Sequence, residues 1–336
     1  MRAPEFWYPK KNATPWQATL LSPLGWLYAF IGRLRAARAK PTRAAVPVIC
    51  VGNLTAGGVG KTPVVIALLK RFKARGLKAI ALTRGYGGKE KGPLFVDPMQ
   101  HGVQEVGDEA LLLSAHAPVV VARDRALGAK LAVEQGADII VMDDGFQNPA
   151  LAKTYSIVVV DAEIQFGNKH VMPAGPLRER VEDGLARANA AVLMGEAEVP
   201  KELKQLPVLR ARIAPAGPTR PLAGRKVLAF AGIGRPEKFF ASLRATGAAL
   251  AGQRSFDDHH FFSENEIAAL KSEAERVGAS LITTEKDFVR IPAGQRSGIS
   301  TFPVHVAFAD EAKIEAIIDS ILLQTSQRSR SREAAV

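Results

Sequence analysis

The chain has 336 residues, a formal net charge of +12 and a hydrophobic fraction of 47%, which is enough apolar material for about two globular domains. Its one cysteine, Cys50, excludes an internal disulfide and a Cys-based zinc site, and it favours a reducing, cytoplasmic compartment. The basic excess suits nucleic acid, anionic lipid or phosphorylated ligands, but no zinc finger, aromatic RNA-binding motif or Lys/Arg block indicates nucleic acid.

The N-terminal segment, residues 1–43, predicts an amphipathic helix that contacts a membrane. Residues 12–32 carry no charge, and basic residues flank them on both sides. Ser22 and Pro23 have the pattern of an N-cap followed by proline in the first helical turn. The residues that then share an apolar face are Leu24, Leu27, Tyr28, Ile31 and Leu34. We expect this helix to lie on the membrane surface; a single span and an ordinary packed helix are the alternatives.

Residues 46–69 follow the order of a phosphate-binding loop, with a strand, a glycine-rich loop and a helix. The apolar run 46–51 predicts a buried strand, and apolar residues recur at helical spacing from Val64 onwards. In such a loop, backbone N–H groups bind the phosphates of ATP, the lysine adds a positive charge and the threonine hydroxyl can ligate Mg²⁺. The loop residues are Thr55, Ala56, Gly57, Gly58, Val59, Gly60, Lys61 and Thr62.

This loop departs from the usual pattern at one position, where Thr55 stands in place of the first glycine. Gly57 and Gly58 can supply the turn instead. A glycine-rich turn without a ligand is the alternative, but a Gly-Lys-Thr sequence between a strand and a helix favours nucleotide binding.

A pair of acidic residues ends the later predicted strand 137–142. Asp143 and Asp144 directly follow this apolar run. An apolar strand that ends in aspartate is the Walker B arrangement, which places a carboxylate beside the Mg²⁺ held by the P-loop threonine. An acidic turn is the alternative.

Several arginines follow predicted strands or rigid loops. Arg84 comes after the strand 78–82 and can reach a phosphate at the carboxyl edge of the sheet. Arg123 and Arg125 open a later helix, and a loop with two prolines presents Arg178 and Glu179. Arginine suits phosphate because its planar guanidinium can donate two parallel hydrogen bonds.

Two acid-containing motifs are ambiguous from spacing alone. Asp108 and Glu109 precede a helical pattern, so an N-cap and a dipole-compensating acid are the simpler interpretation. His259 and His260 follow Asp258, which can orient one histidine for proton transfer, although a structural role fits equally well.

The alternation of strands and helices predicts an α/β protein with two domains. We expect a P-loop NTPase-type domain over 44–214, a parallel sheet with helices on both faces, and a smaller C-terminal α/β domain over 226–323. The Pro- and Gly-rich segment 215–225 reads as a linker, and 324–336 as a disordered tail.

The motifs, in this order, resemble the tetraacyldisaccharide 4′-kinase family, the lipid A kinases of Gram-negative bacteria: GNLTAGGVGKTP, TRGYGG, VGDEA, DDGFQ, PAGPLRE, DDHHFF and TTEKD. The likeness runs from about Trp16 to about Leu323. It implies two α/β domains that close over ATP and Mg²⁺, and transfer of the γ-phosphate to the 4′-hydroxyl of a tetraacylated glucosamine disaccharide 1-phosphate, giving lipid IVA. It also implies a peripheral or monotopic protein at the cytoplasmic face of the bacterial inner membrane, with no nucleic acid and no obligate protein partner.

The same resemblance assigns site residues. Thr62, Asp143 and Asp144 would hold Mg²⁺, and Asp108 would act as the catalytic base, paired with a histidine of the DDHH motif. The catalytic residues implied are Asp108, His259, Lys61, Arg178, Glu179 and Arg125, with His260 and Arg123 open as alternatives to His259 and Arg125.

The main alternative function is a membrane-associated ATPase switch of the deviant-Walker type, whose loop reads KGGVGKT. Ala56 occupies the position of its first lysine here, so that signature residue is missing. A nucleotide-binding adaptor without chemistry is a third possibility. Both alternatives predict that no lipid becomes phosphorylated.

Overall fold

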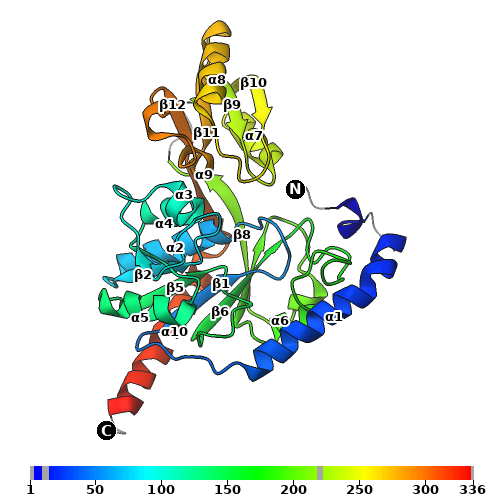
Figure 1. Ribbon diagram of the computed structural model, residues 1–336, viewed down its shortest axis with the longest axis vertical. Helices are drawn as coiled ribbons and strands as arrows, with labels where there is room; N and C mark the ends of the chain where they lie inside the picture. Colours follow the sequence, from blue (N-terminus) through cyan, green and yellow to red (C-terminus); the bar gives the residue numbers. More distant parts are fainter. Residues whose placement is uncertain (1–3, 10–14, 218–221, 334–336) are drawn as a thin grey trace.

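A computed structural model describes residues 4–9, 15–217 and 222–333, with side chains described as far as residue 323. Two sheets of different size organise the chain, and the helix α1 crosses the outside of the larger one (Figure 1). The smaller sheet and its helices lie at one end of the molecule, beyond the C-terminal end of β8 (Figure 1).

The larger sheet is mostly parallel, with the strand order β13-β8-β7-β6-β1-β5-β2-β4-β3. Only the β3–β4 and β13–β8 pairs are antiparallel. The strands are β1 Val48–Gly52, β2 Ala79–Thr83, β3 Leu94–Phe95, β4 Val119–Val121, β5 Ile139–Asp143, β6 Tyr155–Asp161, β7 Ala190–Met194, β8 Val208–Pro215 and β13 Val304–Phe308.

Helices cover both faces of this sheet, as predicted. Ile49 and Val51 of β1 pack into the core cluster under α2, whereas Val48 and Cys50 pack into the cluster on the other face. Because both faces are covered, the central strands β1, β2, β5 and β7 are buried, continuous apolar runs rather than alternating ones. The helical elements of this domain are η1 Glu5–Trp7, α1 Trp16–Arg38, α2 Lys61–Ala74, α3 Val103–Val106, α4 Asp108–Ser114, α5 Arg125–Glu134, α6 Val181–Leu185, η2 Lys201–Leu203 and α10 Glu311–Glu333.

The smaller sheet is parallel throughout, with the strand order β10-β9-β11-β12. Separate apolar clusters on its two faces include residues of α7 and of α8. Its elements are β9 Lys226–Ala231, α7 Pro236–Ala245, β10 Ala249–Ser255, α8 Glu264–Arg276, β11 Ser280–Thr284, α9 Glu285–Phe288, η4 Ala293–Gln295 and β12 Ile299–Phe302.

The structure corrects the predicted end of the smaller domain. Strand β13 pairs with β8 of the large sheet, and Ile314 and Ile318 of α10 are fully buried in the core cluster that contains α2. Residues 304–323 therefore pack with the P-loop domain and not with the smaller domain. The helix α10 also continues to Glu333, where we expected a disordered tail, while residues 334–336 lie outside the described residues. Of the predicted linker, residues 218–221 lie outside them as well.

The helix α1 begins at Trp16, earlier than predicted, and Pro23 lies inside it. The Ser22 hydroxyl donates to the Ala18 carbonyl at 2.7 Å, so Ser22 is not the N-cap. The side of α1 that packs on the domain carries small residues: Ala18, Ser22, Gly25 and Ala29. A Cβ on Gly25 would lie 2.6 Å from the Val171 carbonyl oxygen, so glycine is required for this close approach.

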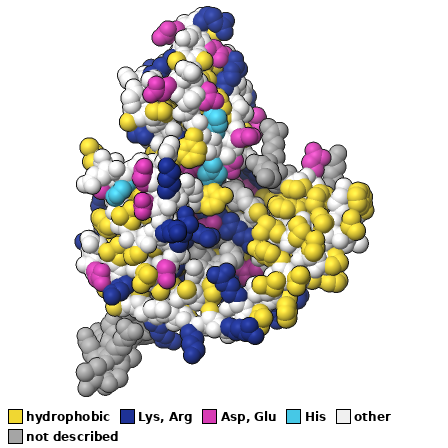
Figure 2. All heavy atoms as spheres, in the orientation of Figure 1, with side chains coloured by type: hydrophobic (Ala, Val, Ile, Leu, Met, Phe, Trp, Pro, Cys, Tyr) yellow, Lys and Arg dark blue, Asp and Glu magenta, His cyan; other side chains and the backbone are white. Residues whose placement is uncertain are grey.

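The large apolar side chains of α1 point away from the domain. The most exposed are Trp26 at 72%, Trp16 at 70%, Leu20 at 69% and Phe30 at 62%. In Figure 2, hydrophobic side chains form a wide patch over α1. Among the described residues, no helix has the length and apolarity to cross a membrane.

Candidate active site

The glycine-rich loop joins β1 to α2 as predicted. Gly60 caps α2 with φ +87°, a conformation that favours glycine, and Lys61 is the first residue of the helix. The Lys61 ammonium donates to Asn53 Oδ1 at 3.1 Å and lies 3.7 Å from Asp144 Oδ1. The helix N-terminus and the lysine together make this a site for phosphate.

The loop that carries Arg178 is paired with the phosphate-binding loop. The Ala56 N–H donates to the Pro176 carbonyl, and the Arg178 N–H donates to the Leu54 carbonyl, each at 2.7 Å. The Arg178 guanidinium then donates to both carboxylate oxygens of Asp144, at 2.8 and 3.0 Å. The structure therefore brings Arg178 and Lys61 to one carboxylate.

Asp143 and Asp144 have different surroundings although they are adjacent. Burial raises the pKa of Asp144, but the charges of Lys61 and Arg178 outweigh it and leave this pKa below its ordinary value. Asp143 is completely buried, and burial, followed by the charge of Glu109, raises its pKa to about 7. Asp144 is thus an ion-pair partner of two cations, whereas at Asp143 burial outweighs the charge of Lys61.

Thr62 and Asp143 fit a magnesium site. The Thr62 hydroxyl donates to Asp143 Oδ2 at 3.2 Å, and Asp143 Oδ1 is buried without a hydrogen-bond partner among the described residues. Within the described part of the chain no three His, Cys, Asp or Glu residues cluster as a protein-only metal cage. Mg²⁺ commonly takes one or two protein oxygens and completes its shell with water and substrate phosphates, which suits this pair.

Replacement of Asp143 tests this assignment. We expect Asp143→Asn to remove the Mg²⁺ dependence of ATP binding, because the orphaned carboxylate oxygen would be lost. Calorimetric titration of ATP with Mg²⁺ and with EDTA measures the effect. Asp138→Asn, an exposed change just before the same strand, serves as the control and should keep the wild-type difference. An Asp143→Asn protein that still binds ATP more tightly with Mg²⁺ would place the metal elsewhere.

Asp108 meets His259 across the two domains. Asp108 is the first residue of α4 and is buried, with its Oδ1 accepting the Glu109 N–H at 2.8 Å. Gly107, not Asp108, is the N-cap of α4, so the simpler interpretation from spacing is wrong. His259 Nδ1 lies 3.0 Å from Asp108 Oδ2. His259 has φ +61°, and such unfavourable backbone conformations often mark functional positions.

The neighbouring histidine has a packing role. His260 stacks on Phe256, contacts Phe262 edge-on and places Nε2 3.0 Å from Glu266 Oε1. Only His259 of the pair faces Asp108, and the structure separates the two alternatives by geometry.

The two candidate arginines also differ. Arg125 is 2% exposed, and its Nη1 donates to the Ala122 carbonyl. Burial, followed by the charge of Arg84, lowers its pKa to about 10, while Asp143 and Asp144 oppose this shift. Its Nε is buried without a partner in the described part of the chain. The Arg123 side chain is exposed and donates to the Gly88 carbonyl at 3.4 Å, whereas the buried Arg125 lies near the aspartates.

Both carboxylate oxygens of Glu179 accept hydrogen bonds from neighbouring side chains. Its Oε1 accepts from Gln147 Nε2 at 3.0 Å, and its Oε2 accepts from Arg187 Nη2 at 2.6 Å. Gln147 also donates to the Asn53 carbonyl at 2.9 Å. Glu179 thereby connects the loop after β5 with the phosphate-binding loop.

Sequence reasoning missed Arg290, which lies just after α9. This arginine is buried, and its Nε donates to Asp108 Oδ2 at 2.8 Å. Lys286, one turn earlier, places its ammonium 3.8 Å from the same oxygen. The available signal was the TTEKD motif at the end of β11, which ends three residues before Arg290 and does not include an arginine.

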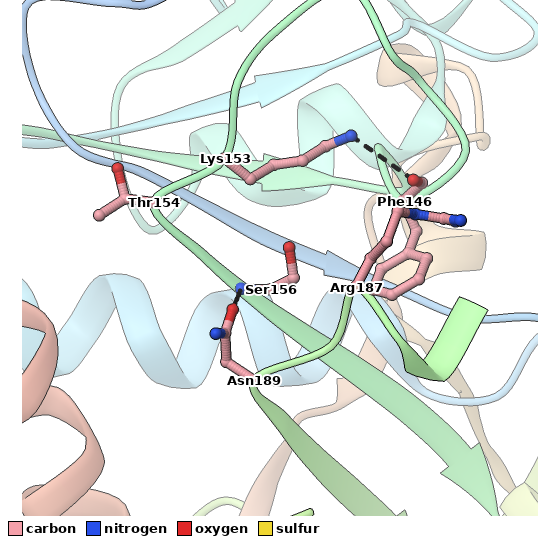
Figure 3. A pocket seen from close by; sticks show the side chains of 6 residues that line it. All are labelled: Phe146, Lys153, Thr154, Ser156, Arg187 and Asn189. Atoms are coloured by element: carbon pink, nitrogen blue, oxygen red, sulfur yellow. Dashed lines mark hydrogen bonds between the residues drawn. The ribbon is translucent and has the colours of Figure 1, made fainter. Parts of the chain in front are cut away.

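A small polar cavity lies beside Arg187, the partner of Glu179 (Figure 3). It has a volume of about 250 Å³ and is lined by Phe146, Lys153, Thr154, Ser156, Arg187 and Asn189. The Lys153 ammonium donates to the Phe146 carbonyl at 3.5 Å, and Asn189 Oδ1 accepts the Ser156 N–H at 2.8 Å. None of the predicted site residues lines it.

Three features define a P-loop nucleotide-binding protein: the parallel sheet, the glycine loop with Lys61 and Thr62, and the buried Asp143 on the neighbouring strand. The family model of tetraacyldisaccharide-1-P 4′-kinase matches residues 17–323 of the chain.

Similar proteins from other bacteria and a solved structure carry the name of the same family. The tetraacyldisaccharide 4′-kinase of Parvibaculum lavamentivorans is 50% identical over 343 residues, covering 98% of this chain and 100% of the relative. That of Rhodospirillum rubrum is 49% identical, covering 96% and 98%. The "apo" form of LpxK from Aquifex aeolicus in complex with ATP superimposes with a TM-score of 0.73 at 28% identity, covering 90% of this chain and 99% of that one. The chain belongs to the tetraacyldisaccharide 4′-kinase family and is a kinase. The ATPase-switch alternative is not supported.

Proposed function

We propose that this kinase transfers the γ-phosphate of ATP to the 4′-hydroxyl of a tetraacylated glucosamine disaccharide 1-phosphate. The observation that carries the proposal is the Asp108–His259 pair, which the two domains assemble in a protein that also has a P-loop. An acid–histidine pair can accept the proton of an acceptor hydroxyl, and an ATPase switch has no need of one.

The cations near Asp144 suit the phosphate groups. Lys61 and Arg178 both contact this carboxylate, and the buried Arg125 lies close to it. Phosphoryl transfer depends mainly on positioning and on stabilisation of the phosphate charge. In our proposal these arginines and the lysine bind the ATP phosphates, Thr62 and Asp143 hold Mg²⁺, Asp144 orients the cations, and Glu179 supports the loop of Arg178. Bound Mg²⁺ would supply charge neutralisation on the phosphates.

The helix α1 supports docking at a membrane surface. Its small side chains pack on the domain and its large apolar ones are exposed, the reverse of a helix that serves only to cover a core. The acyl chains of the substrate can then remain in the lipid while the sugar reaches the site. We place the protein at the cytoplasmic face of the inner membrane, where ATP is available.

A transfer assay tests the function. Purified protein, Mg²⁺ and γ-labelled ATP are mixed with detergent-dispersed disaccharide 1-phosphate lipid, and thin-layer chromatography follows the label. Label in the lipid is the expected result. Label found only as free phosphate, with or without lipid, would instead favour the ATPase switch.

The docking surface has its own test. We expect Trp26→Ser with Phe30→Ser to weaken cosedimentation with anionic liposomes by about tenfold or more, because each buried large apolar side chain contributes about 1.5–3 kcal/mol. Removal of residues 1–32 should weaken it further. Met99→Ser, at a 93% exposed position away from α1, is the control. Unchanged sedimentation of both α1 variants would make α1 a packing element only.

A further inference from the structure

The strongest unassigned feature is the buried guanidinium of Arg290. Its side chain has no exposed surface. Nε donates to Asp108 Oδ2 at 2.8 Å, and Nη2 donates to the same oxygen. Nη1 donates to the Gly232 carbonyl at 2.7 Å and to Asp287 Oδ1 at 3.0 Å.

Most of this assembly belongs to the smaller domain. The Gly232 carbonyl that accepts from Arg290 also accepts the His259 N–H, at 3.1 Å. Asp287, fully buried, accepts from the Thr284 hydroxyl at 2.7 Å and so fixes the far side of the guanidinium. Gly232, His259 and Arg290 thus form a socket within one domain, and Asp108 enters it from the other.

The Asp108 carboxylate is almost fully buried, and both of its oxygens already accept hydrogen bonds. Its side chain is 4% exposed, Oδ1 accepts the Glu109 N–H, and Oδ2 accepts from His259 and Arg290. The His259 side chain, by contrast, is 33% exposed. When Nδ1–H donates to Asp108, Nε2 carries the free lone pair of the ring. The histidine, and not the carboxylate, is then the group that meets a substrate hydroxyl.

We propose that Arg290 is a positioning residue, supplied by the smaller domain, which holds the Asp108 carboxylate in the orientation in which it meets Nδ1 of His259. This inference rests on the proposed role of the Asp108–His259 pair in phosphate transfer. In the step, the acceptor O–H bond breaks and its proton goes to Nε2. The oxygen bonds to the γ-phosphorus as the bond to the β,γ-bridging oxygen breaks and ADP leaves. The proton later passes from His259 to water.

Arg290 also lies against the histidine itself. Its Nη2 is 3.3 Å from His259 Nδ1, so the guanidinium contacts both members of the pair. The other groups facing the pair are Asp258, 3.9 Å from Nε2, the Tyr86 ring, Lys286 with Glu109, and Asp287 behind Arg290.

Loss of the guanidinium should act on the chemical step. Without it, the Asp108 carboxylate loses two hydrogen bonds and no longer fixes the His259 ring. We expect kcat to fall ~100-fold, within the range for loss of general acid–base catalysis, while the KM for ATP stays near the wild-type value. Arg290→Lys keeps the charge but not the two-pronged geometry, so it should restore only part of kcat.

The experiment compares Arg290→Met and Arg290→Lys with wild type and with Arg296→Met. Arg296 is a structural arginine of the same domain, donating to the Ile291 and Val289 carbonyls. The measurements are kcat, the KM for ATP, Tm, and the NMR signals of the His259 ring in ligand-free protein, assigned with a His259→Gln sample. We expect both Arg290 variants to lower kcat and to move the His259 ring signals, and Arg296→Met to lower only Tm.

A folded Arg290→Met protein with wild-type kcat and wild-type His259 ring signals would reduce Arg290 to a contact that holds the domains together, and the proposal would fail. If Arg290→Met does not fold, the same two measurements on Arg290→Lys decide. A wild-type protein that labels no lipid would contradict the proposed function, whereas the His259 ring signals would still test Arg290.

Discussion

Lys61→Ala is expected to abolish phosphate transfer to the lipid. The ammonium sits at the N-terminus of α2 between Asn53 and Asp144, where its positive charge can stabilise the transferring phosphate. Loss of one such stabilising donor typically costs 10²–10³-fold in rate, and the lysine of a P-loop contacts two phosphates. We therefore expect a loss of ~10³-fold or more in kcat/KM.

The matched control is Lys73→Ala, on the exposed side of the same helix. It tests whether loss of any α2 lysine disturbs the protein. We expect wild-type transfer and an unchanged Tm for this variant. Near-normal transfer by Lys61→Ala, with the control also active, would remove the phosphate-binding role from the loop.

Asp108→Asn should lower kcat strongly and leave ATP affinity nearly unchanged. The residue contacts His259 and Arg290 rather than the phosphate-binding loop, so its effect belongs to the transition state. Loss of a general base commonly costs about 10²–10⁴-fold. The ATP dissociation constant, measured by calorimetry, should change by less than ~3-fold.

The same substitution has a stability cost. Asparagine leaves Arg290 with Asp287 as its remaining carboxylate partner, and removing one partner of a buried ion pair costs about 3–5 kcal/mol. The rates should thus be measured well below the melting temperature of the variant. Asp257→Asn, an exposed acid in the same motif as His259, is the control. An unchanged kcat for folded Asp108→Asn would leave Asp108 as a structural ion-pair residue.

The central strands and the phosphate-binding loop were predictable because their signals are local. A strand buried on both faces must be an apolar run, and Gly60 with Lys61 must stand where β1 meets α2. The two acids at the end of β5 followed from the same logic. The different environments of these two acids could not be predicted, because burial and the approach of Arg178 depend on residues that are distant in the sequence.

Other features could not be predicted because tertiary contacts decide them. Ser22-Pro23 has the local pattern of a helix start, yet the helix runs through it. Thr19, whose carbonyl loses its partner N–H at Pro23, is exposed, as is Pro23 itself, so the break costs less than it would in a core. Arg290 has no local signal at all, since its partner Asp108 precedes it by 182 positions.

The return of the chain to the large sheet has a consequence for biosynthesis. Strand β13 and helix α10 are made only after the entire smaller domain. Until then the nascent P-loop domain lacks its edge strand and the isoleucines that cover α2. During translation it carries an uncovered apolar face, the kind of surface that chaperones bind. Synthesis of β13 and α10, rather than completion of the phosphate-binding half, is therefore the step that allows the P-loop domain to fold completely.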